Sequence, residues 1–231
     1  MTSAGVSRWT DNQIGSMDDA RARVHNSPYD NFLITGILAK IYLALSAEAD
    51  LREKISSILE IDYEDALTEF EKAPFKHEPI SWEHTYSTSK STYLATMIWT
   101  AALLYQITDK VDYQLFVEQK LEDLLDCQEN EGISLFDGSL LKGMFYRDEE
   151  KKVFQHFNHQ AREHLYAYAL AEAQKIVTDK SLSVKLLAAI SNYGDYLKYL
   201  MNFTAPYPMI ASGIYEKMSG KIRNLLISNI Y

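Results

Sequence analysis

The chain has very little cysteine and no long apolar run. Its only cysteine, Cys127, excludes an internal disulfide, and the neighbouring Leu124 and Leu125 predict that its thiol is buried and inert. The apolar stretch 33–45 is interrupted by Lys40 and is too short to span a membrane. Residues 1–9 lack the apolar core of a signal peptide. These absences predict a soluble, cytoplasmic protein without a membrane partner.

Basic residues are also scarce. The chain has 23 Lys and Arg against 32 Asp and Glu, a net charge of -9. Its only basic cluster, 217–223, is short and is expected to form a tail. Binding to a nucleic-acid backbone needs clustered cations, so a nucleic-acid partner is not expected. The sequence also lacks a glycine-rich phosphate loop and a Ser-His-Asp order, and we expect no cofactor.

Helical periodicity is abundant. Apolar residues recur at the spacing of an α-helix through most of the chain, whereas the alternation typical of strands is weak. Six helices are predicted, over about 28–45, 51–70, 87–105, 116–128, 159–177 and 182–200. The sequence therefore predicts a single all-α domain over residues 1–231.

The connections between these helices alternate in length. Short turns such as 108–110 and 178–180, both Thr-Asp-Lys, join helices within a pair, and long loops at 73–86 and 130–158 join successive pairs. This alternation is typical of αα-hairpin repeats whose long loops gather at one end. It predicts part of a helical toroid with a cleft at the loop end.

Planar polar side chains are concentrated between residues 143 and 164. Three of the six histidines lie here, with two arginines and several aromatic residues. The residues of this group with planar hydrogen-bonding side chains are Tyr146, Arg147, Gln155, His156, His159 and Arg162. Oriented donors of this kind favour recognition of a carboxylate or hydroxyl, with pairing among neighbours as the alternative. The histidine spacing does not match a zinc motif, so no metal is expected.

Three further features have both a functional and a structural explanation. Trp9 beside Asp11, Asp18 and Asp19 could stack on a sugar ring and bind its hydroxyls, or belong to a merely charged terminus. The pair Glu83-His84 could perform acid–base chemistry, or could cap a helix. The sixteen tyrosines suit helix packing with solvated hydroxyls, and a few of them suit a sugar platform.

The chain resembles bacterial six-hairpin glycosidases related to glycoside hydrolase family 9, the cellulase-like group. The resemblance covers about Trp9 to Tyr215. Its motifs are Trp9-Thr10-Asp11-Asn12, Gly15, Asp18-Asp19, Pro28-Tyr29-Asp30, Phe32, Gly143-Met144-Phe145-Tyr146-Arg147-Asp148, Gln155-His156-Phe157, His159, Arg162-Glu163, Tyr193-Gly194-Asp195-Tyr196-Leu197, Thr204-Ala205-Pro206-Tyr207, Ser212 and Ile214-Tyr215. The resemblance implies an (α/α) six-hairpin toroid and inverting cleavage of a glycosidic bond. The substrate-binding residues that we assign on the motifs and the composition together are Trp9, Asp11, Asp18, Asp19, Tyr146, Arg147, His156, His159, Arg162 and Glu163.

The chain departs from that family in its catalytic carboxylates. Inversion needs a carboxylate base and a distant carboxylic acid. The family carries its base in an Asp-Ala-Gly-Asp motif, which this sequence lacks, and its acid in a C-terminal segment that 217–231 does not resemble. We therefore expect the central fragment of a toroid, with catalytic residues unassigned, that binds carbohydrate at most weakly and does not cleave it.

Two other functions fit the same sequence. A polysaccharide lyase on the same toroid would use a neutralising group and a base of the types supplied by Tyr146, Asn158, His159 and Arg162. A helical-repeat protein that binds other proteins would have the same hairpins without a ligand cleft. An incomplete ring would also expose the apolar faces of its terminal hairpins, so self-association is expected.

Overall fold

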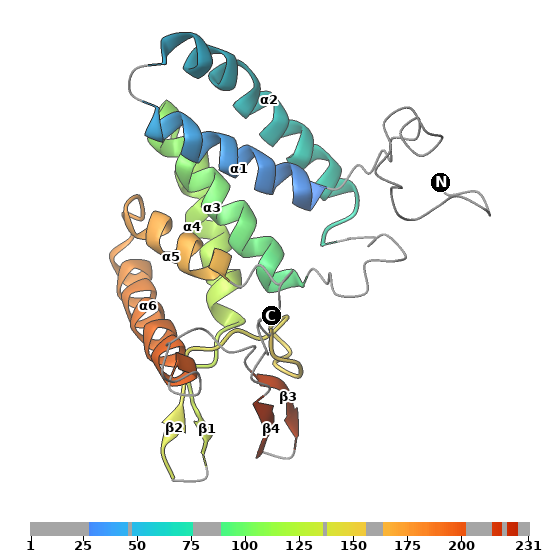
Figure 1. Ribbon diagram of the computed structural model, residues 1–231, viewed down its shortest axis with the longest axis vertical. Coiled ribbons are helices and arrows are strands. Elements are labelled where there is room, and N and C mark those ends of the chain that lie inside the picture. The colour runs from blue at the N-terminus through green and yellow to red at the C-terminus, as the bar shows by residue number, and fades with distance from the viewer. Residues whose placement is uncertain are drawn as a thin grey trace, which may run out of the picture.

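The computed structural model describes residues 28–45, 48–75, 89–135, 138–155, 164–201, 214–218 and 221–225. The helices are α1 (Pro28–Ala44), α2 (Ala49–Lys72), α3 (Lys90–Thr108), α4 (Val111–Asp126), α5 (His164–Gln174) and α6 (Lys180–Met201). The strands are β1 (Ile133–Ser134), β2 (Leu140–Leu141), β3 (Ile214–Met218) and β4 (Lys221–Leu225). The mostly helical prediction is confirmed (Figure 1).

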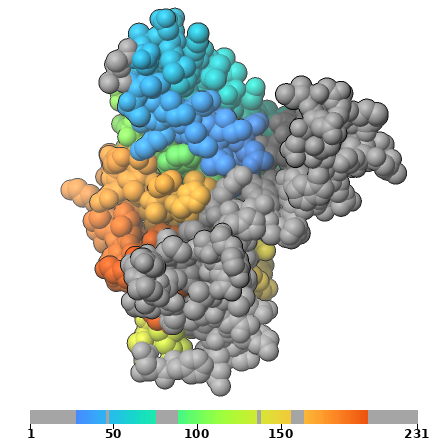
Figure 2. Space-filling view, viewed as in Figure 1, coloured from blue at the N-terminus to red at the C-terminus, as the bar shows by residue number. Residues whose placement is uncertain are grey.

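The helices pack in sequential pairs that are linked through α3. Helix α1 contacts α2 and α3, α3 contacts α4 and α5, and α5 contacts α6. The connections within the pairs are short, and α1 and α2 run antiparallel (Figure 1). In the space-filling view, the α1–α2 pair lies beside the α5–α6 pair (Figure 2). The three odd-numbered helices therefore form a row, and each is accompanied by the helix that follows it.

Helix α3 forms the centre of the fold. Every residue from Ser91 to Leu104 is buried, so the helix is enclosed on all sides rather than along one stripe. It begins at Lys90 and not at the predicted 87, because Ser89 caps it. The Ser89 Oγ accepts from the backbone N–H of Thr92 at 3.2 Å, and the Ser89 N–H donates to Thr92 Oγ1 at 2.9 Å. This reciprocal pair is a capping box.

A glycine allows α1 to lie directly against α3. A Cβ atom at Gly36 would come within 2.6 Å of both Thr100 Oγ1 and the Trp99 ring, a distance that real side chains do not tolerate. One turn away, Thr100 Oγ1 donates to the backbone carbonyl of Phe32 at 2.8 Å. The close approach of the two backbones therefore depends on the missing side chain at Gly36.

A buried carboxylate joins three helices. Glu172 of α5, with 7% of its side chain exposed, accepts from Lys40 of α1 at 2.8 Å, Gln106 of α3 at 2.9 Å and Lys175 at 2.5 Å. Burial alone would raise the pKa of Glu172, but these hydrogen bonds outweigh burial and lower it to about 2. The charge is thus paired with groups from α1 and α3 and with Lys175 just after α5, and it joins the odd-numbered row.

The basic cluster 217–223 is not a simple tail, and that expectation was wrong. Strands β3 and β4 form an antiparallel hairpin in which Glu216 pairs with Arg223 and Met218 with Lys221. The sequence Lys221-Ile222-Arg223 alternates polar and apolar residues, which suits a strand.

The terminal pairs expose several large apolar side chains. On α1 these are Ile34, Ile37 and Ile41, which are 53%, 45% and 41% exposed and lie on one helical stripe. On α6 they are Val184 and Leu187. These exposed residues lie on the terminal helix pairs, where the sequence predicts apolar faces that drive self-association. The self-association itself stays a prediction. Among the described residues, none of the helices combines the length and apolarity that a membrane crossing requires.

Candidate functional site at the loop end

In the long connection between α4 and α5, the described residues 127–135 and 138–155 form a folded structure rather than an open loop. Its chain folds back on itself through isolated bridges that pair Gln128 with Phe145 and Tyr146 with Phe154, and β1 pairs with β2. The backbone N–H of Tyr146 donates to the Cys127 carbonyl at 2.8 Å, and that of Gln155 donates to the Phe145 carbonyl at 2.9 Å. We call residues 127–135 and 138–155 the loop platform.

The loop platform is fixed to α6. Gly143 has a φ of 94°, and a Cβ atom there would lie 1.9 Å from the Asn192 carbonyl oxygen, so only glycine fits. The Gln128 side-chain amide donates to the carbonyls of Gly143 at 3.1 Å and of Ala189, in α6, at 3.0 Å. These contacts with α6 hold the platform in position without the help of a ligand.

The loop platform is also fixed to the start of α3. The backbone N–H of Ser91 donates to the Arg147 carbonyl at 3.0 Å, and Lys90 forms an ion pair with Glu149 at 2.7 Å. A hydrogen bond of 2.8 Å joins the Arg147 N–H to the Val153 carbonyl. Arg147, one of the predicted ligand residues, is half-buried on this anchored bend. Its backbone position is therefore set by contacts on both sides.

Tyr146, another predicted ligand residue, is fully buried in the platform. Its hydroxyl donates to Glu129 Oε2 at 2.5 Å, and its ring stacks on Phe154 with centroids 4.4 Å apart. Burial and the Glu129 carboxylate together raise the pKa of Tyr146. The described contacts of Tyr146 are therefore internal, and they support the platform rather than present a ring to solvent.

Sequence reasoning missed Glu129, which organises the platform. Its carboxylate is buried and accepts from the backbone N–H groups of Glu131 at 3.0 Å and Gly132 at 2.8 Å, in addition to Tyr146. The Asn and Gly of the run Glu129-Asn130-Glu131-Gly132 favour a turn, and they are the sequence signal at this point. Gly132 has a φ of 103°.

The remaining predicted ligand residues lie outside the described residues. They are Trp9, Asp11, Asp18, Asp19, His156, His159, Arg162 and Glu163. The same is true of Asn158, Glu83 and His84. Of the ten predicted substrate-binding residues, the structure thus places Tyr146 and Arg147 on the loop platform.

Phe145 links the described residues before and after segment 156–163, because it contacts both Gln155 and Tyr166. Gln155 is buried, hydrogen-bonded through its backbone to Phe145, and the Phe145 ring stacks on Tyr166 of α5 with centroids 4.1 Å apart. The Tyr166 hydroxyl and Ser91 Oγ are 2.6 Å apart. The side-chain carbonyl of Gln155 is buried, and the described residues offer it no hydrogen-bond partner. The chain thus enters and leaves segment 156–163 beside the platform and the start of α3.

The thiol at the edge of the platform is buried, as predicted. Cys127 is fully buried, and burial raises its pKa to about 12, so the reactive thiolate is disfavoured at neutral pH. Across the part of the chain that the structure describes, no three His, Cys, Asp or Glu side chains are grouped to hold a metal ion.

Comparisons of the chain with protein-family models, with curated proteins and with solved structures gave no match.

Proposed function

We propose that this chain is a carbohydrate-binding domain of the six-hairpin glycosidase type, which holds an oligosaccharide at the loop end. The observation that carries the proposal is the position of Arg147 on the anchored loop platform. The platform adjoins the point where segment 156–163 leaves and rejoins the described fold. A guanidinium can donate several hydrogen bonds to sugar hydroxyls or to a uronate. Its partners in binding would be the histidines and Arg162 of the adjoining segment.

The helix arrangement supports the same proposal. In a toroid of αα-hairpins, the first helices of successive pairs lie side by side and the second helices lie outside them. Helices α1, α3 and α5 form such a row here. The proposed architecture is part of an (α/α) toroid whose long connections face the ligand.

The proposed domain binds without cleaving. Hydrolysis with inversion needs a general acid and a general base, each worth roughly 10²–10⁴-fold in rate. Glu129, the buried carboxylate of the platform, already accepts three hydrogen bonds from the protein. We assign it a structural role and leave the catalytic pair unassigned.

Ligand-observed NMR titration with a panel of β-linked gluco-oligosaccharides and oligouronates tests the proposal. Arg162→Ala and Arg147→Ala should weaken binding by up to about 1.5–3 kcal/mol, the value of a charged hydrogen bond. Lys54→Ala, an exposed cation on α2, is the matched control and should leave binding unchanged. Absence of binding to the whole panel by the folded chain would contradict the proposal.

Activity assays on the same panel test the absence of cleavage. Reducing-end formation should not exceed background, and no unsaturated uronate should absorb in the ultraviolet. Robust hydrolysis that is abolished by changing Asp11, Asp18, Asp19 or Glu163 would assign a catalytic role to that carboxylate. Formation of an unsaturated product would instead establish a lyase.

A further inference from the structure

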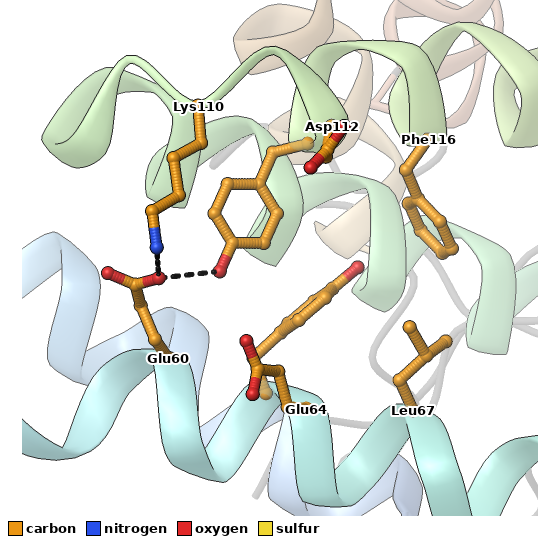
Figure 3. A pocket seen from close by; sticks show the side chains of 8 residues that line it. Glu60, Glu64, Leu67, Lys110, Asp112 and Phe116 are labelled. Carbon is orange, nitrogen blue, oxygen red and sulfur yellow. Dashed lines mark hydrogen bonds and ion pairs between the residues drawn. The ribbon is translucent and has the colours of Figure 1, made fainter.

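A pocket lies between α2 and α4, away from the loop platform (Figure 3). It has a volume of about 240 Å³ and is lined by Glu60, Tyr63, Glu64, Leu67, Lys110, Asp112, Tyr113 and Phe116. The α2 residues follow the spacing of one helical face, and the others belong to the turn before α4 and its first turns. The pocket lies at the start of α4, and the platform begins after its C-terminal end. Because α4 has 16 residues, it is about 24 Å long and keeps the two sites apart.

The lining has an excess of negative charge. It contains the carboxylates Glu60, Glu64 and Asp112 but only one ammonium, that of Lys110. Lys110 is paired with Glu60, which also accepts from the Tyr113 hydroxyl at 3.4 Å (Figure 3). The side-chain carboxylates of Glu64 and Asp112, both exposed, form neither a hydrogen bond nor an ion pair within the described part of the chain. One carboxylate from each helix thus remains available at the pocket.

The carboxylates of Glu60, Glu64 and Asp112 all line this pocket and interact electrostatically with one residue in it. The pKa of Tyr113 is raised by burial first, and then by the charges of Glu60, Glu64 and Asp112. Three acidic groups from two helices therefore converge on one phenol. A cation in this space would be attracted by all three of them.

Aromatic rings form the apolar wall of the pocket. Tyr63 meets Tyr113 edge to face with centroids 5.3 Å apart, and meets Phe116 at 6.1 Å. The ammonium of Lys120 lies 6.0 Å from the Phe116 ring centroid, so this ring already interacts with a cation. Such a wall suits the alkyl part and the positive end of an organic cation.

A buried hydroxyl in the lining also lacks a partner. Tyr63 is 2% exposed, and its hydroxyl has no hydrogen-bond partner among the described residues. Buried hydroxyls are normally satisfied, because an unpaired one keeps its full desolvation cost. An N–H group that enters the pocket would supply the missing donor. This hydroxyl is an observation independent of the acidic charges, and it points to a ligand.

We propose that the α2–α4 pocket binds a primary alkylammonium group, with Glu64 and Asp112 holding the charge and Tyr63, Tyr113 and Phe116 enclosing the chain. A metal ion fits the pocket less well, because its carboxylates are not grouped for coordination within the described residues. The volume of about 240 Å³ lies below the range of about 300–1,000 Å³ that holds drug-sized ligands, which suits a short amine. The group can come from a free amine or from a lysine side chain, which the test below distinguishes.

Ligand-observed NMR titrations of the full chain, at constant ionic strength, test this site. The probes are n-butylammonium, 1,4-diaminobutane, N-acetyl-lysine methylamide and the neutral isostere butan-1-ol. We expect the ammonium probes to bind and butan-1-ol to bind at least about tenfold more weakly, because it carries no charge. Stronger binding of the diamine would indicate a free amine, and stronger binding of the lysine derivative would indicate a protein side chain.

Matched variants locate the binding. Glu64→Gln and Asp112→Asn should each weaken n-butylammonium binding by about three- to tenfold, whereas both together should abolish it. Glu53→Gln and Asp65→Asn make the same changes on exposed α2 residues outside the pocket and should have no effect. Circular dichroism verifies that each variant is folded.

Three results would overturn the proposal. They are absence of ammonium binding by the folded chain, equal affinity for butan-1-ol, and equal weakening by the control substitutions. Phe116→Leu adds a second check, because it preserves apolar volume but removes the ring. It should lower affinity for the ammonium probes by about two- to fivefold, consistent with the contribution of an exposed cation–π contact.

Discussion

The Tyr146 hydroxyl donates to Glu129 Oε2 at 2.5 Å inside the loop platform, and both residues are buried. The carboxylate that receives this hydrogen bond also accepts from the backbone of Glu131 and Gly132. This side-chain pair therefore adds to the backbone bridges that join the segment after α4 to the segment that carries Tyr146. The platform in turn holds Arg147 at the proposed ligand site.

Tyr146→Phe should destabilise the protein by about 1.5–3 kcal/mol, because it removes a hydrogen bond to a buried charge. Urea unfolding measures the change. Tyr105→Phe is the control, since the Tyr105 hydroxyl has no hydrogen bond within the described residues, and its effect should stay near zero. Equal effects of the two substitutions would show that the Tyr146–Glu129 contact contributes nothing specific.

Gly143→Ala should destabilise by about 3 kcal/mol or more, because the new Cβ would overlap the Asn192 carbonyl and force the platform away from α6. Gly138→Ala is the matched control for this substitution. Gly138 also has positive φ, 82°, but nothing lies within 4 Å of its added Cβ, so only the backbone cost of about 1 kcal/mol applies. Thermal or urea unfolding of both variants tests the difference. Equal losses would mean that the platform does not rest on α6 at this point.

Glu172 should make stability depend on acidic pH. Its folded pKa, about 2, lies below the usual value of 4.5, so its contribution is complete above the usual value and is lost as pH falls toward 2. Since both lysine partners are more than half exposed, we expect a contribution of about 1–3 kcal/mol. Urea unfolding between pH 7 and pH 3 measures it.

Glu172→Gln should lower stability at pH 7 and should reduce the loss on acidification relative to the unmodified chain. Glu122→Gln removes an exposed ion pair with Lys185 and should change stability by less than about 1 kcal/mol. If the two variants showed the same pH profile, the buried network would not be the source of the effect.

The α1 stripe should drive self-association. Ile37→Lys places a charge in the middle of the exposed row formed with Ile34 and Ile41, and should shift sedimentation profiles toward monomer. Leu140→Lys changes an exposed apolar residue elsewhere, on β2, and should leave the profile unchanged. A sharp monomer boundary for the unmodified chain at high concentration would exclude this association.

The sequence by itself determined the helices and their pairing. Periodic apolar residues, Pro28 at the start of α1 and the Thr-Asp-Lys turns are local signals, and local signals specify helices and short connections. The burial of Cys127 could likewise be predicted from the sequence, because its leucine neighbours mark a buried helix face. Of the predicted ligand residues, the structure describes Arg147 and Tyr146, and the sequence alone could not tell that Tyr146 is enclosed.

Only the tertiary structure decided what depends on contacts between distant segments. Glu129 meets Tyr146, and Glu172 meets Lys40 across 132 positions, because folding brings those side chains together. The same holds for the α2–α4 pocket, where Glu64 and Asp112 approach from separate helices. Each of these acidic residues resembles an ordinary surface charge in sequence. Burial and the choice of partner give Glu129 and Glu172 their roles, whereas Glu64 and Asp112 gain theirs from lining one pocket, and all of this depends on the packing of helices rather than on local spacing.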